Sequence, residues 1–119
     1  MTITFDIGIC AYNEEANIGK LLQNLLTQQT DTDFRLDRII VVASGCTDKT
    51  EEIVKGYLKI HSEVKLITER ERRGKTSALN KMLDAVQADV LVYLNADVVP
   101  AQGSINAMLR YFLDNSVGT

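Results

Sequence analysis

The sequence predicts an α/β, Rossmann-like domain, a parallel sheet of about four strands with helices on both faces. Three observations lead to this prediction. Apolar runs of strand length alternate four times with stretches whose apolar residues recur at helical spacing. The runs are apolar throughout, which indicates strands covered on both faces. The chain has 119 residues, 45% of them hydrophobic, so we expect residues 1–119 to form a single domain with its own core.

The first unit begins with ITFDIGIC at residues 3–10, a run rich in Ile that predicts a strand. Asn13 is the expected N-cap of the helix that follows. Glu14 and Glu15 would lie in its first turn, where they suit the positive end of the helix dipole. Apolar residues at helical spacing mark this helix: Ile18, Leu21, Leu22, Leu25 and Leu26.

Three further units follow in the same order. Their strands are predicted from RIIVVAS, VKLIT and DVLVYLN, at residues 38–44, 64–68 and 89–95. Asp48 and Glu51 resemble a capping box at the start of the second helix. The second helix is marked by Ile53, Val54, Tyr57 and Leu58, the third by Ala78, Leu79, Met82, Leu83 and Val86, and the fourth by Ile105, Met108, Leu109 and Phe112.

The series stops near Val117, where a fifth strand would begin, so we expect a fragment of a larger sheet. The edge of its fourth strand would be unpaired, and we expect a homodimer through that edge. The net charge of −3, without a long basic block, argues against nucleic-acid binding. Cys10, Cys46 and a single histidine support neither a disulfide framework nor a zinc site. No run reaches the roughly 18 apolar residues of a membrane span, and no signal pattern is present, so a cytoplasmic location is predicted.

In a parallel sheet, functional groups collect on the loops after the carboxyl ends of the strands, near the point where the strand order reverses. These loops are residues 11–15, 43–48, 70–75 and 95–100. Tyr12 either stacks on a nucleobase or covers the end of the sheet. Ser44 and Cys46 suit a tight turn, and a helix start nearby would lower the pKa of the Cys46 thiol.

The third loop contains Gly74, Lys75 and Thr76, which also end the phosphate-binding loop of nucleotide hydrolases. That loop needs a second glycine five positions earlier, and Glu69 stands there, so we reject this interpretation. A helix start with Arg73 and Lys75 beside it, and Gly74 for close approach, indicates an anion site. The alternative is a solvated charged turn.

Asp97 follows the fourth strand and is a candidate ligand for Mn²⁺ or Mg²⁺ bridging a diphosphate, because these cations take carboxylate and phosphate oxygens. The alternative is a turn residue before Pro100. Asp48 is expected to cap a helix rather than to bind a ligand.

Four segments in order, AYNEEANI, VVASGCTDKTEEIV, RRGKTSALNKML and VYLNADVVP, resemble the N-terminal, nucleotide-sugar-binding half of family-2 glycosyltransferases with the GT-A fold. The resemblance covers essentially the whole chain. By this resemblance the first loop holds the base and ribose, and the third lies over the diphosphate. The implied contacts are Ala11, Tyr12 and Glu14 in the first loop and Arg73, Gly74 and Lys75 in the third.

Two positions depart from the family pattern. The family's nucleobase-binding aspartate is replaced by Ala43 and Ser44, so a neutral hydroxyl stands in its place. The family's Asp-x-Asp signature begins here with Asn95, which can bond a ribose hydroxyl, and ends with Asp97, the implied metal ligand.

The resemblance implies metal-assisted transfer of a sugar from a UDP- or GDP-linked donor to an unidentified acceptor hydroxyl, with inversion. It places the catalytic base beyond residue 119, so we expect no turnover by these residues alone, and it allows a longer parent at the cytoplasmic face of a membrane. Two alternatives stay open, namely a nucleotidyltransferase that makes sugar nucleotides and a non-catalytic binding module of this fold. The first normally has a glycine-rich first loop, and AYNEEANIG has no glycine before Gly19.

Overall fold

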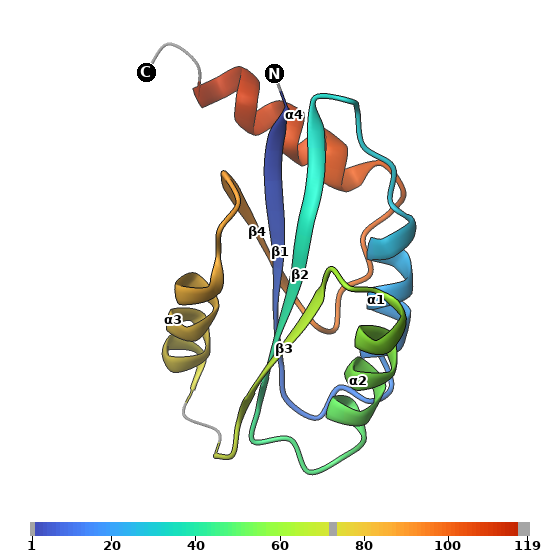
Figure 1. Cartoon of the computed structure of the whole chain (residues 1–119), viewed down its shortest axis with the longest axis vertical. Coiled ribbons are helices and arrows are strands. Elements are labelled where there is room, and N and C mark those ends of the chain that lie inside the picture. The colour runs from blue at the N-terminus through green and yellow to red at the C-terminus, as the bar shows by residue number, and fades with distance from the viewer. Residues whose placement is uncertain (1, 72–73, 117–119) are drawn as a thin grey trace.

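A computed structural model shows four strands and four helices in strict alternation (Figure 1). It describes residues 2–71 and 74–116. The strands are β1 (Ile3–Ala11), β2 (Phe34–Ser44), β3 (Val64–Glu69) and β4 (Val90–Asn95). The helices are α1 (Ile18–Thr27), α2 (Thr50–Ile60), α3 (Lys75–Ala85) and α4 (Ser104–Ser116). All eight predicted elements are present, in the predicted order.

The four strands form one parallel sheet in the order β3-β2-β1-β4. The chain therefore moves outward from β1 to β3 and then returns to the other side of β1, so the strand order reverses between β1 and β4. The carboxyl ends of β1, β2 and β3 lie in the lower part of Figure 1, away from α4. In this sheet β4 is an edge strand, as predicted, and β3 is the other edge.

The two faces of the sheet are covered unequally. One face carries the main core, to which α1, α2 and α4 contribute buried residues such as Leu22, Val54 and Leu109. Among the described elements, α3 alone lies on the other face, where its Ala78 and Met82 pack against Val42. Figure 1 shows α3 alone on one side and α1 with α2 on the other. Helices on both faces are thus confirmed, but the second face has a small core.

Some apolar residues that marked the helices are exposed. Leu79 and Leu83 of α3 and Met108 and Phe112 of α4 are between 36% and 52% exposed. Fewer apolar residues of α3 and α4 are buried against the sheet than the sequence pattern predicts. No helix in the described part of the chain is long and apolar enough to span a bilayer.

One of the two predicted helix caps is wrong. Helix α1 begins at Ile18 with Asn17 at the N-cap, so Glu14 and Glu15 precede its first turn. Asn13 instead has a positive φ of 50°, a conformation that asparagine tolerates better than most residues. Lys49 occupies the N-cap position of α2, but Asp48 caps this helix with its side chain as predicted, because it accepts the backbone N–H of Thr50, the first residue of α2, at 2.9 Å. The other bonds of Asn13 and Asp48 are described with the site below.

Strand β2 begins at Phe34, before the predicted start at Arg38. Phe34 is buried, and its Cα pairs with Ile3 at the start of β1. Three of the four residues between Phe34 and Ile39 are charged, so this part of the strand is not a continuous apolar run and the sequence pattern does not predict it.

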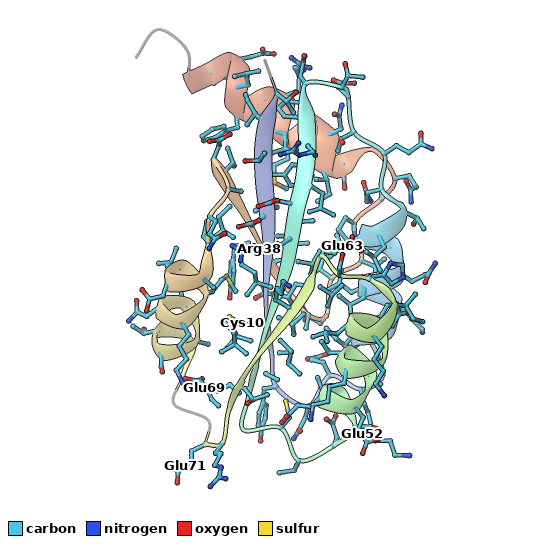
Figure 2. The ribbon with its side chains drawn as sticks, in the orientation of Figure 1. Cys10, Arg38, Glu52, Glu63, Glu69 and Glu71 are labelled. Carbon is cyan, nitrogen blue, oxygen red and sulfur yellow. The ribbon has the colours of Figure 1, made fainter. Side chains whose placement is uncertain are left out.

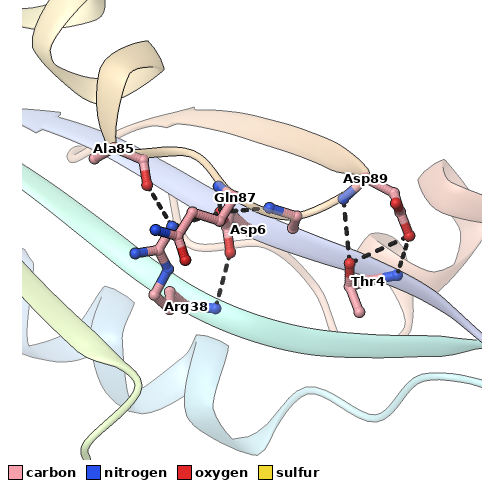
Figure 3. A network of polar contacts seen from close by, with 7 residues as sticks. Thr4, Asp6, Arg38, Ala85, Gln87 and Asp89 are labelled. Carbon is pink, nitrogen blue, oxygen red and sulfur yellow. Dashed lines mark hydrogen bonds and ion pairs between the residues drawn. The ribbon is translucent and has the colours of Figure 1, made fainter.

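The β1–β2 pair is fixed to the α3–β4 connection by a buried carboxylate, Asp6 (Figure 3). Asp6 accepts hydrogen bonds from the backbone N–H of Arg38 at 3.0 Å, Gln87 at 3.1 Å and Ala88 at 3.3 Å. The Arg38 guanidinium pairs with the same carboxylate at 3.3 Å and also donates to the Ala85 carbonyl. A buried charge with several donors around it is tolerated because its lost hydration is replaced.

We expect Asp6→Ala to destabilise the fold by roughly 3–5 kcal/mol, because it leaves the Arg38 charge and three N–H groups without their acceptor. Asp89→Ala is the matched control. Asp89 is exposed, and its carboxylate accepts a hydrogen bond from the backbone N–H of Thr4 at 3.0 Å. Removing this carboxylate should cost about 1 kcal/mol. Urea unfolding of both variants measures the difference, and equal losses would contradict the role given to Asp6.

Gly8 in β1 lets α3 approach the sheet. A Cβ at this position would lie 2.1 Å from the Met82 sulfur, and Met82 is fully buried. We expect Gly8→Ala to cost about 1–3 kcal/mol by overpacking. Gly56→Ala is the control, since nothing lies within 4 Å of a Cβ there and alanine should stabilise α2 by about 0.5–1 kcal/mol. Thermal unfolding checks both, and a neutral Gly8→Ala would show that Met82 moves aside freely.

Candidate donor-nucleotide site

A pocket lies at the carboxyl ends of β1 and β4, where the strand order reverses, which is where open parallel sheets bind their ligands. Residues from all four strand–helix units surround it. Its lining consists of Cys10, Ala11, Tyr12, Ser44, Gly74, Ala78, Tyr93 and Asn95. Five of these are predicted site residues: Ala11, Tyr12, Ser44, Gly74 and Asn95. Figure 2 shows Cys10 on the side of the sheet that faces α3.

The register of the sheet explains how these residues meet. Cys10 of β1 pairs with Asn95 at the end of β4, and Ala11 pairs with Ala43, directly before Ser44. Gly74 precedes α3 with φ 92°, a left-handed conformation that favours glycine. The start of α3 therefore opens onto the pocket, with its backbone N–H groups at the positive end of the helix.

Two aromatic rings and several small residues shape the pocket. Tyr12 and Tyr93 are 43% and 41% exposed, so their rings are partly available to a flat ligand. Burial and a neighbouring Cys10 raise the pKa of Tyr93, which keeps its hydroxyl neutral. Burial also raises the pKa of the Cys46 thiol, so the predicted lowering is wrong and the helix start does not outweigh desolvation.

A buried carboxylate, Glu69, lies directly behind Ser44. It ends β3, where the parallel register pairs it with Ser44, and it is 3% exposed. Glu69 accepts hydrogen bonds from the hydroxyls of Ser44 at 2.8 Å and Ser77 at 2.7 Å. Its second oxygen, Oε2, also pairs with Lys81 at 3.1 Å. Figure 2 shows Glu69 at the end of β3, beside α3.

The hydrogen bond from Ser77, followed by those from Ser44 and Lys81, lowers the pKa of Glu69 against the opposing effect of burial. Glu69 is therefore a carboxylate at neutral pH. These contacts also connect the ends of β2 and β3 to α3.

The first two loops are tied together at the rim of the pocket. The Asn13 side-chain oxygen accepts hydrogen bonds from the backbone N–H of Thr47 at 2.8 Å and Asp48 at 3.3 Å. In return, Asp48 accepts from the backbone N–H of Glu15 at 3.1 Å. Thr50 completes the link, because its hydroxyl accepts from the Glu14 N–H at 2.9 Å and donates to Asp48 at 2.6 Å.

Two other predicted site residues, Glu14 and Asp97, are described but do not line the pocket. The Glu14 carboxylate accepts a hydrogen bond from Asn17 at 3.0 Å, within its own turn. Asp97 is exposed beyond the end of β4. Lys75 is the first residue of α3, but its side chain, like the whole of Arg73, lies outside the described part of the chain.

The donor set for a metal ion is small. Among the described residues, no group of three or more His, Cys, Asp or Glu side chains is placed to hold one. At the end of β4, Asn95 contributes an amide oxygen and Asp97 a carboxylate. This set suits Mg²⁺ or Mn²⁺ only when phosphate oxygens complete the coordination, which is how these ions are commonly held.

Sequence reasoning missed three residues that shape the site. Glu69 was considered only as an obstacle to a phosphate loop, although a carboxylate at the end of a buried strand was a sign that it had partners. Asn13 caps no helix, and its side chain instead bonds the backbone of the second loop. Tyr93 was treated as an ordinary strand residue, yet it alternates with the buried Val92 and so belongs to the face that α3 leaves partly open.

The sequence matches glycosyl transferase family 2 over residues 6–118. The chain belongs to this family. It is 28% identical over 101 residues to a dolichyl-phosphate beta-glucosyltransferase of Trichomonas vaginalis, covering 81% of this chain and 31% of the relative. It is 32% identical over 98 residues to a glucosyl-3-phosphoglycerate synthase of Mycobacterium tuberculosis, covering 81% of this chain and 29% of the relative. The chain thus spans about a third of the length of these curated relatives.

Solved glycosyltransferase structures share the fold. A mannosyltransferase from Pyrobaculum calidifontis, in complex with GDP-Man and Mn²⁺, superposes with a TM-score of 0.86 at 30% identity, covering 99% of this chain and 34% of that one. A glucosyl-3-phosphoglycerate synthase from Mycobacterium tuberculosis, with Mn²⁺, UDP and glucosyl-3-phosphoglycerate, gives a TM-score of 0.69 at 26% identity, covering 93% and 39%. The predicted family and GT-A fold are confirmed.

The lowered pKa of Glu69 predicts how acid affects stability. Because the folded-state pKa lies below the ordinary value of 4.5, ionised Glu69 contributes stability above that pH, and the contribution is lost as the pH falls through the folded-state pKa. We therefore expect Glu69→Gln to be less stable than wild type at pH 7, with a gap that narrows below about pH 4.5. Urea unfolding between pH 7 and 3 measures this gap.

Glu71→Gln is the control. It removes one carboxylate charge, as Glu69→Gln does, but Glu71 is exposed and lies two residues further along the chain. Its stability relative to wild type should change little over this range. A gap between wild type and Glu69→Gln that stays constant with pH would contradict the role of the ionised carboxylate.

Proposed function

We propose that this chain forms the donor-binding part of a glycosyltransferase that moves a sugar from a UDP- or GDP-linked donor to an acceptor hydroxyl, with inversion. The observation that carries the proposal is the pocket at the strand reversal. Residues from four separate loops, chosen from the sequence as one nucleotide-sugar site, line it together. Family membership and the GDP-Man and UDP complexes of similar proteins support the same assignment.

Each side of the pocket suits one part of a nucleoside diphosphate. The tyrosine rings, above all Tyr12, offer apolar faces for the base. Asn95 has both a donor and an acceptor for ribose hydroxyls. The diphosphate would lie at Gly74, where the start of α3 and the charges of Arg73 and Lys75 favour an anion.

Asp97, assisted by Asn95, would hold a divalent cation against the diphosphate. When bound, such a cation neutralises the negative charge of the leaving diphosphate. The chain's own contribution is to place one carboxylate at the end of β4 and to keep the pocket behind it narrow, so that the diphosphate itself completes the site.

The proposal extends to the assembly and the location of the protein. The unpaired edge of β4 is the surface through which we propose a homodimer, because an edge strand offers open backbone hydrogen-bonding groups. A cytoplasmic site of action fits the two cysteines, neither of which forms a disulfide in the structure.

Calorimetric titration with UDP, GDP and their sugar conjugates, with and without Mn²⁺, tests the donor site. Binding rather than turnover is the suitable measurement, since the chain matches only about a third of its relatives. We expect Mn²⁺ to strengthen binding and Asp97→Ala to weaken Mn²⁺-dependent binding about tenfold or more.

Asp84→Ala is the matched control, because Asp84 is an exposed carboxylate near the far end of α3. It should bind like wild type. A wild-type chain that binds no nucleoside diphosphate would overturn the donor site, and equal binding by wild type and Asp97→Ala would overturn the metal ligand alone.

A further inference from the structure

Ser44 is the most deeply placed polar side chain of the pocket, with 6% of its surface exposed. Its hydroxyl carries one proton and two acceptor lone pairs. The direction in which that proton points decides whether Ser44 donates to a ligand or accepts from it. Little water reaches a hydroxyl at this depth, so a water molecule cannot bridge a mismatched pair.

Glu69 fixes that direction. An ionised carboxylate can only accept hydrogen bonds, and the Ser44 hydroxyl lies 2.8 Å from Glu69 Oε1. Ser44 must therefore donate its only proton backwards, away from the ligand. Towards the pocket it presents lone pairs alone, as a carboxylate would.

Two further contacts hold Glu69 in this state. Ser77 donates to Oε2 at 2.7 Å, and Lys81 lies 3.1 Å from the same oxygen. Both are donors and both lie on α3, so they orient the carboxylate and leave Oε1 for Ser44. The positive charge of Lys81 also favours the ionised form.

Ser44 and Tyr12 follow the paired residues Ala43 and Ala11 and line the same pocket, so Ser44 lies at the end to which the base is assigned. We propose that Glu69 is a positioning residue that, through Ser44, turns the base end of the pocket into a hydrogen-bond acceptor and so selects a nucleobase with a ring N–H. Uracil and guanine have such a group at the edge opposite the sugar, whereas cytosine and adenine have a bare ring nitrogen there. The inference rests on the proposed function, because it requires the pocket to hold a nucleotide.

Glu69→Gln gives this proposal a specific consequence. The donors at the Oε2 position, Ser77 and Lys81, need an oxygen, so the new amide places its oxygen there and its NH₂ group beside Ser44. The NH₂ then donates to Ser44, and the serine proton turns towards the pocket. The base end of the pocket changes from acceptor to donor with almost no change in shape.

The test compares UDP with CDP, and GDP with ADP, by calorimetry in Mn²⁺. Within each pair the ring nitrogen changes from donor to acceptor. We expect wild type to prefer UDP to CDP or GDP to ADP, and the larger preference names the base. Glu69→Gln should shift the preferred ratio towards CDP or ADP by about tenfold or more, since a mispaired buried polar group is costly.

Two variants complete the design. Glu71→Gln removes an exposed charge from the same turn and should keep the wild-type ratio. Ser44→Ala should remove the preference, and adding Glu69→Gln to it should change the ratio no further, since one residue acts through the other. Ser44→Ala is also the direct test if Glu69→Gln does not fold, as judged by circular dichroism.

Each outcome has one meaning. A shifted ratio in Glu69→Gln, absent in Glu71→Gln, supports the relay. Equal weakening of all diphosphates, an unchanged ratio, or a full preference in Ser44→Ala overturns it while leaving the donor site in place. A wild-type chain that binds no nucleoside diphosphate overturns both the donor site and the relay.

Discussion

The structure depends on the unequal faces of its central strand, β1. One face carries Phe5, Ile7 and Ile9, all buried against the main core. The opposite face carries Asp6 and Gly8, which leave room for α3 and fix the connection that follows it. Because β1 is paired on both sides, a change of register in this strand would exchange the two faces and displace every helix.

The position of α3 then determines the pocket. Met82 lies against Gly8, and this close approach brings the start of α3 to the ends of β1 and β4. The same helix supplies Ser77 and Lys81 to Glu69. A single packing contact on a sparsely covered face thus places both the helix terminus and the partners of the buried carboxylate.

The order and type of the elements were predictable because hydrophobic spacing is a local property, readable from a few consecutive residues. The helix starts were not. Asn13 can cap its own helix or bond the amides of Thr47 and Asp48, and only the position of a distant loop decides between them. The early start of β2 was hidden for a similar reason, since Phe34 is held by its pairing with the distant Ile3 and by burial in the main core, while its neighbours in sequence are polar.

The site was predictable in outline, because parallel strands place their following loops at one edge. Its chemistry was less so. Ser44 and Glu69 are 25 residues apart in sequence, and their contact follows from the register of β2 with β3, which no local pattern reveals. The position of Asp97 after a strand predicts that it lies at the carboxyl edge of the sheet. The sequence does not predict that its side chain is exposed there.

The bonds between the first two loops have a consequence for how such a protein changes over time. Asn13 and Asp48 each hold the backbone of the other's loop, so neither loop keeps its shape if the other is exchanged. An inherited change in one loop is tolerated only with a matching change in the other. The pair, rather than either loop, is the piece that could be transplanted into a related scaffold with its shape kept.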